Sequence, residues 1–127
     1  MAKQIPNLIE LLVSAIASAE GYFVPASLPN RLNNPGDLRP WKGCTLPIEH
    51  NFVHPRTIEE GTAIAYRQVA IDIARGWSLR QLVYSWAPTS DANNSALYLS
   101  ETARRIGMAT TDIDTPLWNF LALDHIP

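Results

Sequence analysis

Five of the ten prolines lie in one stretch, residues 21–54, and they limit what this part of the chain can form. Proline lacks a backbone N–H and biases the residue before it toward extended geometry, so no long helix can pass through the stretch. We therefore predict an ordered loop followed by a small hairpin, with one strand at Asp37 to Arg39 and the other at Asn51 to His54. A loop of this length in a compact domain usually has a function.

Apolar residues recur at helical spacing before and after this stretch. The first helix is expected over about residues 7–20, with Asn7 as its N-cap and Gly21 just beyond its end. Two capping boxes, Thr57-Ile58-Glu59-Glu60 and Ser78-Leu79-Arg80-Gln81, mark the starts of two more helices, at about 58–75 and from about 79 to just before Pro88.

A fourth helix is expected at about residues 93–106, capped by Asp91 or Asn93, and a short last helix opens at Thr115-Pro116. The chain has 127 residues, which is room for one domain with one core. The predicted fold is a mainly α (α+β) single domain over residues 1–127, with a small β-hairpin inserted after the first core helix.

Charge and composition exclude several classes of function. The net charge is -2, so the chain lacks the positive field that binding to nucleic acid or anionic lipid requires. No run of about 18 apolar residues exists, so no membrane span is expected. The single cysteine, Cys44, and the three scattered histidines show no metal-ligand spacing. We expect a monomer that needs no metal or cofactor.

The N-terminal residues have some features of a secretory signal. Lys3 precedes an apolar segment that ends in Ala17-Ser18-Ala19, small residues like those at a cleavage site. Glu10 interrupts that segment, and its apolar positions are periodic rather than continuous. We therefore expect the segment to be the first helix and not a cleaved signal.

Glu20 is the first candidate for chemistry. It ends the first predicted helix, where the helix dipole disfavours a carboxylate, and it lies at the border between core and solvent. Both effects raise a carboxyl pKa, which is what a general acid needs near neutral pH. The alternative is a glutamate at a frayed helix end that points into water.

Polar and aromatic residues that suit a sugar follow in two segments. In Asn33-Asn34-Pro35-Gly36-Asp37-Leu38-Arg39, two amides adjoin a Pro-Gly turn, although an ordinary Asn-capped turn has the same pattern. Around Pro88, aromatic side chains lie beside amides, as in carbohydrate grooves. Trp86 and Trp118 are expected in the core, and Trp41 is expected to be exposed. The residues of this second segment are Tyr84, Trp86, Asn93, Asn94 and Tyr98.

The order of these segments resembles lysozyme-like peptidoglycan lytic transglycosylases and related phage muramidases. The resemblance rests on Ala-Ser-Ala-Glu-Gly at 17–21, Asn-Asn-Pro-Gly-Asp-Leu-Arg at 33–39, Phe52 with Thr-Ile-Glu-Glu-Gly at 57–61, and the Trp-Ala-Pro…Asn-Asn…Tyr stretch at 86–98. It spans roughly residues 13–107. Two positions depart from the family: Asp37 stands where Asn is expected, and Trp86 where Tyr is usual.

The resemblance implies a lysozyme-like fold and a glycosidase that cleaves the β-1,4 bond from N-acetylmuramic acid to N-acetylglucosamine. Glu20 matches the catalytic acid and base. Peptidoglycan glycan strands are the implied partner, and no metal is implied. The substrate-binding residues expected on this basis, together with the two segments above, are Asn33, Asn34, Gly36, Asp37, Tyr84, Asn94 and Tyr98.

Two reaction types are open. A lytic transglycosylase works with one glutamate and forms a 1,6-anhydro product, whereas a second carboxylate favours hydrolysis. Asp37 and Asp91 are candidates for that second carboxylate, whereas Glu60 is used in a capping box and Glu59 is expected to face solvent. Arg39 is expected to pair with Asp37.

Two other functions remain as alternatives to the enzyme. One is a noncatalytic peptidoglycan-binding or virion structural module on the same fold. The other is a helical adaptor, which would expose Leu8 and Leu11 for a partner. An enzyme acting at the cell wall or periplasm without an export signal would need phage-type or other non-classical delivery.

Overall fold

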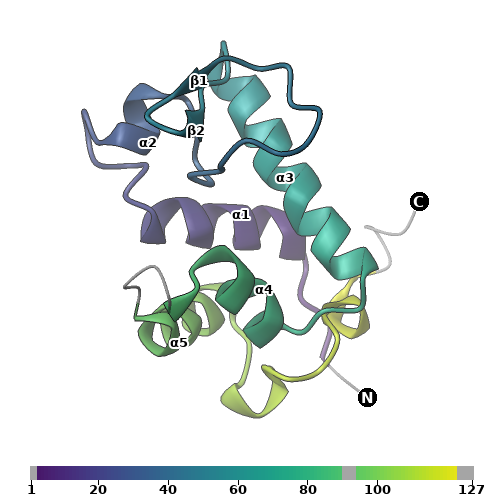
Figure 1. Ribbon diagram of the computed structural model, residues 1–127. Coiled ribbons are helices and arrows are strands. Elements are labelled where there is room, and N and C mark those ends of the chain that lie inside the picture. The colour runs from purple at the N-terminus through teal and green to yellow at the C-terminus, as the bar shows by residue number, and fades with distance from the viewer. Residues whose placement is uncertain (1–2, 90–93, 123–127) are drawn as a thin grey trace.

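A computed structural model describes residues 3–89 and 94–122. It is mainly helical, with one two-stranded antiparallel hairpin. Helix α1 (Leu8–Ala19) crosses the centre of the molecule, with the loop and hairpin on one side of it and α4 and α5 on the other (Figure 1). Helices α3 (Ile58–Ala74) and α5 (Ser95–Ile106) pack directly on α1, and α4 (Leu79–Trp86) packs on α5. None of the described helices is long and apolar enough to cross a bilayer.

Helix α1 forms the centre of the core, as its spacing predicts. Its Leu8, Leu12 and Ile16 are at most 1% exposed and share one cluster with the apolar faces of α3, α4 and α5. Leu11 packs against this cluster as well. A helical adaptor would expose Leu8 and Leu11, so the full burial of Leu8 and the partial burial of Leu11 contradict that hypothesis.

The helix boundaries follow local capping rules closely. Ser78 and Gln81 form the complete predicted capping box of α4. Thr57 caps α3, but the Glu60 carboxylate accepts from the Arg56 N–H at 2.9 Å, so that box is only half formed. Asn7 occupies the N-cap position of α1 in a left-handed conformation and makes no side-chain cap bond.

Helix α5 begins later than predicted. Asn94 caps it, because the Asn94 Oδ1 accepts from the Leu97 N–H at 3.1 Å. The predicted caps, Asp91 and Asn93, lie outside the described residues. Gly107 ends the helix in a left-handed conformation, as expected.

The hairpin differs from its prediction. Its strands are β1 (Ile48–Glu49) and β2 (Phe52–Val53), joined by a turn with positive φ at both His50 and Asn51. Two such residues form the type I′ turn that suits the twist of a two-residue hairpin. The predicted first strand, Asp37 to Arg39, gives β2 a single backbone bond, from the Val53 N–H to the Leu38 carbonyl at 3.0 Å. It extends no further, because Asp37 is left-handed and Pro40 has no N–H.

Three short elements complete the chain. Helix α2 (Leu28–Arg31), which was not predicted, begins at Ser27, whose Oγ accepts from the Asn30 N–H. The turns η2 (Thr110–Asp112) and η3 (Leu117–Phe120) follow α5. The turn η3 buries Leu117 and Phe120, but Trp118, which was expected in the core, is 50% exposed. Trp118 instead covers Gly76 at the end of α3.

Candidate active site

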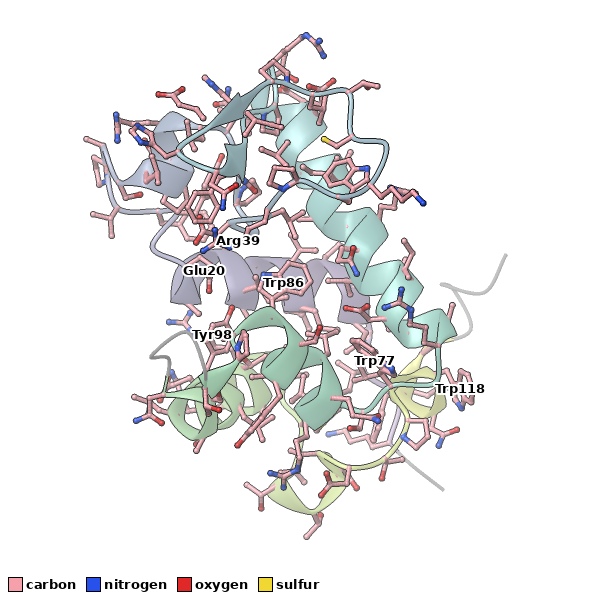
Figure 2. The ribbon with its side chains drawn as sticks, viewed as in Figure 1. Glu20, Arg39, Trp77, Trp86, Tyr98 and Trp118 are labelled. Carbon is pink, nitrogen blue, oxygen red and sulfur yellow. The ribbon has the colours of Figure 1, made fainter. Side chains whose placement is uncertain are left out.

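Glu20 lies at the C-terminal end of α1, between the loop that carries Arg39 and the helix that carries Tyr98 (Figure 2). Its backbone N–H closes the helix on the Ile16 carbonyl at 2.9 Å, and Gly21 then turns the chain away with φ 79°. The side chain is largely buried, and burial is the main cause that raises the pKa of Glu20 from 4.5 to about 7. Glu20 therefore holds a proton close to neutral pH, as a general acid must.

Asp37 is the nearest charged neighbour of Glu20. The two carboxyl groups are within hydrogen-bonding reach, and Asp37 is a further cause of the raised Glu20 pKa. The pKa of Asp37 is itself raised by burial, although the Glu20 hydrogen bond and the nearby Arg39 charge oppose that rise. Two carboxyl groups in contact share a proton, because both cannot carry a charge at that distance without a large cost.

Tyr98 approaches Glu20 from α5. Its hydroxyl lies close enough to lower the Glu20 pKa, yet it is buried without a regular hydrogen bond to any described residue. Burial, followed by the Glu20 charge, raises the pKa of Tyr98, so the hydroxyl stays protonated. A buried donor that lacks a good acceptor is costly, so a small movement of Glu20 or a bound oxygen would be favoured here.

The turn that carries Asp37 is held by Asn34. The Asn34 side chain is fully buried, donates to the carbonyls of Leu38 and Val53 at 3.0 Å each, and accepts from the Leu38 N–H at 2.9 Å. Its amide is therefore engaged inside the protein, and the expectation that Asn34 contacts a sugar does not fit its position. Asn33 likewise donates to the Pro55 carbonyl at 3.2 Å. Both amides fix the turn on which Asp37 sits.

Gly36 and Gly61 are required by close packing around the same turn. A Cβ on Gly61 would lie 1.7 Å from the Asn33 carbonyl oxygen, so α3 can approach the turn only with glycine there. A Cβ on Gly36 would lie 2.9 Å from the Trp86 ring. The Trp86 indole N–H also donates to the Gly36 carbonyl at 2.7 Å. Gly36 is buried beneath the half-buried Trp86 ring. Its position therefore does not fit the expectation that Gly36 contacts the substrate.

Two hollows are each lined by one of the residues that act on the Glu20 pKa. One, the α5 groove, lies between α1 and α5, has a volume of about 260 Å³ and contains the Glu20 neighbour Tyr98. The other, the α4 cavity, lies between α3, α4 and the turn, has a volume of about 240 Å³ and contains the Glu20 neighbour Asp37. The main lining residues of the α4 cavity are Asp37, Arg39, Gln68, Asp72, Ser85 and Trp86.

Two of the residues expected to bind substrate lie at the edge of this arrangement. Asn94 borders the α5 groove, although its side-chain oxygen caps α5. Tyr84 lies apart from Glu20, since its hydroxyl is near Arg80, whose pKa is raised by Asp114 and, more weakly, by Tyr84. Of the residues predicted for the site, the structure thus brings Asp37 and Tyr98 to Glu20.

Arg39 and Asp72 are site residues whose positions the sequence does not predict. Arg39 makes no ion pair within 4 Å among the described residues, so the expected pair with Asp37 is not a direct contact, although the Arg39 charge lowers the pKa of Asp37. Its guanidinium lies 4.6 Å from the centre of the Phe52 ring instead. Asp72, on α3, is 1% exposed at the wall of the α4 cavity. The only sequence signal for this cation–π contact is an aromatic residue, Phe52, in the predicted hairpin. No sequence signal places Asp72 at the cavity.

No metal site is apparent in residues 3–89 and 94–122, where no three His, Cys, Asp or Glu side chains gather suitably. Cys44 is a half-buried free thiol. The candidate site is therefore the Glu20 carboxyl, which holds a proton near neutral pH, with an acidic neighbour, Asp37, and a buried phenol, Tyr98, which each line one of the two hollows.

Comparison with protein-family models, with curated proteins and with solved structures finds no match to this chain. The chemistry of the site must therefore be argued from its own geometry.

Proposed function

We propose that the protein is a lysozyme-like enzyme that cleaves the β-1,4 bond between N-acetylmuramic acid and N-acetylglucosamine in peptidoglycan. The observation that carries the proposal is the Glu20 carboxyl, whose pKa is raised to about 7, beside Tyr98 and Asp37, which each line one of the two hollows. A glycosidic oxygen is a poor leaving group until it receives a proton, and a buried carboxylic acid can supply one. The order of the sequence motifs supports the same substrate.

The contact between Glu20 and Asp37 favours the lytic transglycosylase reaction over hydrolysis with two carboxylates. Retaining glycosidases separate their two carboxyl groups by about 5–5.5 Å, and inverting ones by about 6.5–9.5 Å. Glu20 and Asp37 each affect the pKa of the other, in part through a hydrogen bond, which fits a pair that shares a proton better than a pair held apart at either separation. We therefore assign Asp37 to tuning the acidity of Glu20 and not to the role of nucleophile or base.

The proposed reaction uses the Glu20 carboxyl twice, first as an acid and then as a base. Glu20 donates its proton to the glycosidic oxygen, and the bond from that oxygen to the anomeric carbon of the muramic acid breaks. The 6-hydroxyl oxygen of the same sugar then bonds to the anomeric carbon and returns its proton to Glu20. The products are a free 4-hydroxyl end and a 1,6-anhydro end, and Glu20 regains its starting state. The Tyr98 hydroxyl, buried beside the carboxyl, can stabilise Glu20 while it is ionised.

The test uses purified sacculi and three forms of the protein. The wild type should release soluble muropeptides with anhydro ends, which mass spectrometry separates from hydrolysed ends by the mass of one water. Glu20→Gln should release none. Glu59→Gln, which removes an exposed carboxylate from the first turn of α3, should behave as the wild type.

Two results would contradict the proposal. Release at the wild-type rate by the Glu20→Gln variant would exclude Glu20 as the acid. Wild-type protein that sediments with sacculi but releases nothing would instead identify a noncatalytic wall-binding or virion module. As an enzyme, the protein is proposed to act as a monomer at the cell wall, reached by phage-type or other non-classical delivery.

A further inference from the structure

The α4 cavity differs from a plain sugar subsite in its charge. Arg39 lies at its rim and Asp72 at its wall, so the cavity has a cation and a buried carboxylate. Asp72 already has Arg75 as a charged partner at 3.4 Å, whereas Arg39 makes no ion pair within the described residues, and a neutral sugar ring would offer Arg39 none. The ligand that suits this lining therefore carries charge of its own, beside polar groups for Gln68 and Ser85.

Arg39 is prepared to bind an anion. Phe52 supports one face of its guanidinium, and within the described residues no carboxylate or carbonyl occupies its N–H donors. The planar donor set of arginine fits a carboxylate with two parallel hydrogen bonds. The ring contact restricts the side chain beforehand, so less rotamer freedom is lost when an anion binds.

Asp72 is held in place for a different kind of partner. It accepts from the Gln68 amide at 3.1 Å and from Arg75 at 3.4 Å, and both contacts are made by Oδ1. Oδ2 takes part in neither of these contacts, and the residue lines the cavity. The cavity can therefore accept an N–H group at one side while Arg39 binds a carboxylate at the other.

We propose that the α4 cavity binds the peptide stem of the muramic acid at the cleaved bond, with Arg39 pairing with a stem carboxylate. The inference rests on the proposed function. The stem is joined through the lactyl group to the same sugar ring whose anomeric carbon reacts. A cavity that begins at Asp37, in contact with Glu20, is at the right place for that substituent. A stem offers carboxylates together with amide N–H groups, whereas the glycan alone offers one carboxylate at most.

The experiment measures binding without turnover, in a Glu20→Gln background. Isothermal titration is carried out with three ligands: N-acetylglucosaminyl-N-acetylmuramic acid with a free lactyl carboxylate, the same disaccharide bearing L-Ala–D-Glu, and that compound with its glutamate carboxylates amidated. We expect the L-Ala–D-Glu compound to bind most tightly. Arg39→Gln should weaken it about tenfold and leave the amidated compound unchanged. Arg31→Gln, at an exposed arginine of α2 outside the cavity, is the control.

Each other outcome overturns the inference. If Arg39→Gln weakens all three ligands equally, Arg39 does not recognise a stem carboxylate. If the free lactyl compound binds as tightly as the stem compound and loses as much with Arg39→Gln, the lactyl carboxylate is the partner and the stem is not. Because binding is measured in an inactive variant, failure of the cleavage assay would be seen separately and would leave this result interpretable.

Discussion

Replacing Asp37 by asparagine is expected to shift the alkaline limb of the pH–activity profile to lower pH. Burial is the main cause of the raised Glu20 pKa, and the Asp37 charge and hydrogen bond add to it. Asparagine keeps the shape of the side chain but removes the charge and the shared proton. Glu20 would then lose its proton at a lower pH, so the protonated fraction that can act as general acid would fall at a lower pH than in the wild type.

The size of the effect is bounded by the Glu20 pKa itself, which rises from 4.5 to about 7. Since burial remains in the variant, only part of this rise should be lost, and we expect the pKa to fall by about one unit. The protonated fraction of Glu20 at pH 7 would then fall from about one half to about one tenth, which lowers the rate about fivefold. At pH 5 Glu20 is mostly protonated in both forms, so the two rates should be nearly equal.

The substitution should leave the fold intact. Asp37 has φ 51°, a left-handed conformation that asparagine tolerates about as well as aspartate. Its backbone N–H donates to the Asn34 carbonyl at 3.0 Å, and this bond does not depend on the side chain. The melting temperature should accordingly change little.

The assay combines rates with a direct titration. Initial rates of sacculus clearing are measured from acid to alkaline pH at constant ionic strength, and the side-chain carboxyl of Glu20 is titrated by carbon-13 NMR without substrate. Glu59→Gln controls for the change in net charge, because its carboxylate is exposed and distant in the fold. An unchanged Glu20 midpoint in Asp37→Asn would refute the reasoning. Loss of activity at every pH, with a normal Glu20 titration, would instead give Asp37 a direct part in the chemistry.

Three further predictions concern stability. Because Glu20 ionises less easily in the folded state, the folded state loses stability as the pH rises from about 4.5 through 7. Glu20→Gln removes this loss. Its free energy of unfolding, measured by thermal denaturation, should exceed that of the wild type by about 1–2 kcal/mol at pH 8 and should equal it at pH 4. Gly61→Ala should destabilise by about 1–3 kcal/mol or more in urea, because its Cβ would overlap the Asn33 carbonyl oxygen. Ser78→Ala should cost about 1 kcal/mol in urea, because it removes the cap bond to the Gln81 N–H at 3.2 Å.

These stability predictions have simple controls. Thr62→Ala changes the exposed neighbour of Gly61 and should cost far less than the glycine substitution. Ser100→Ala, at an exposed position of α5, is the matched control for Ser78→Ala. Equal losses in a variant and its control would contradict the structural explanation. A Glu20→Gln stability that parallels the wild type from acid to alkaline pH would mean that burial does not raise the Glu20 pKa.

The helices could be predicted from the sequence because their signals are local. The Ser78 capping box, the glycines at the helix ends and the apolar spacing of α1 each lie within one element, and the structure agrees with them. The hairpin could not be predicted as well. The sequence predicts its first strand at residues 37–39, but a left-handed Asp37 and Pro40 stop the pairing there. The His50-Asn51 turn lacks glycine, so the usual hairpin signal is absent.

The site was predictable to the extent that it depends on Glu20 and its position at a helix end. Asn34 shows why the rest was not. An amide beside a Pro-Gly turn predicts a ligand contact, but the Asn34 amide donates its hydrogen bonds to the carbonyls of Leu38 and Val53. The bond to Val53 depends on how the loop closes, which the sequence does not show. Arg39 similarly depends on Phe52 of the hairpin for its position. Contacts between residues far apart in the chain decide which polar groups remain available.

The turn at Asn34 links these contacts to the acidity of Glu20. Asn34 fixes Leu38 by hydrogen bonds in both directions, so Asp37 is held between two anchored residues and cannot easily turn away from Glu20. Trp86 binds the Gly36 carbonyl from α4, which ties the opposite wall of the α4 cavity to the same turn. The same turn therefore sets both the width of the α4 cavity and the contact between the Glu20 and Asp37 carboxyl groups. A catalytic acid gains from such support, because its environment need not reorganise when the proton is transferred.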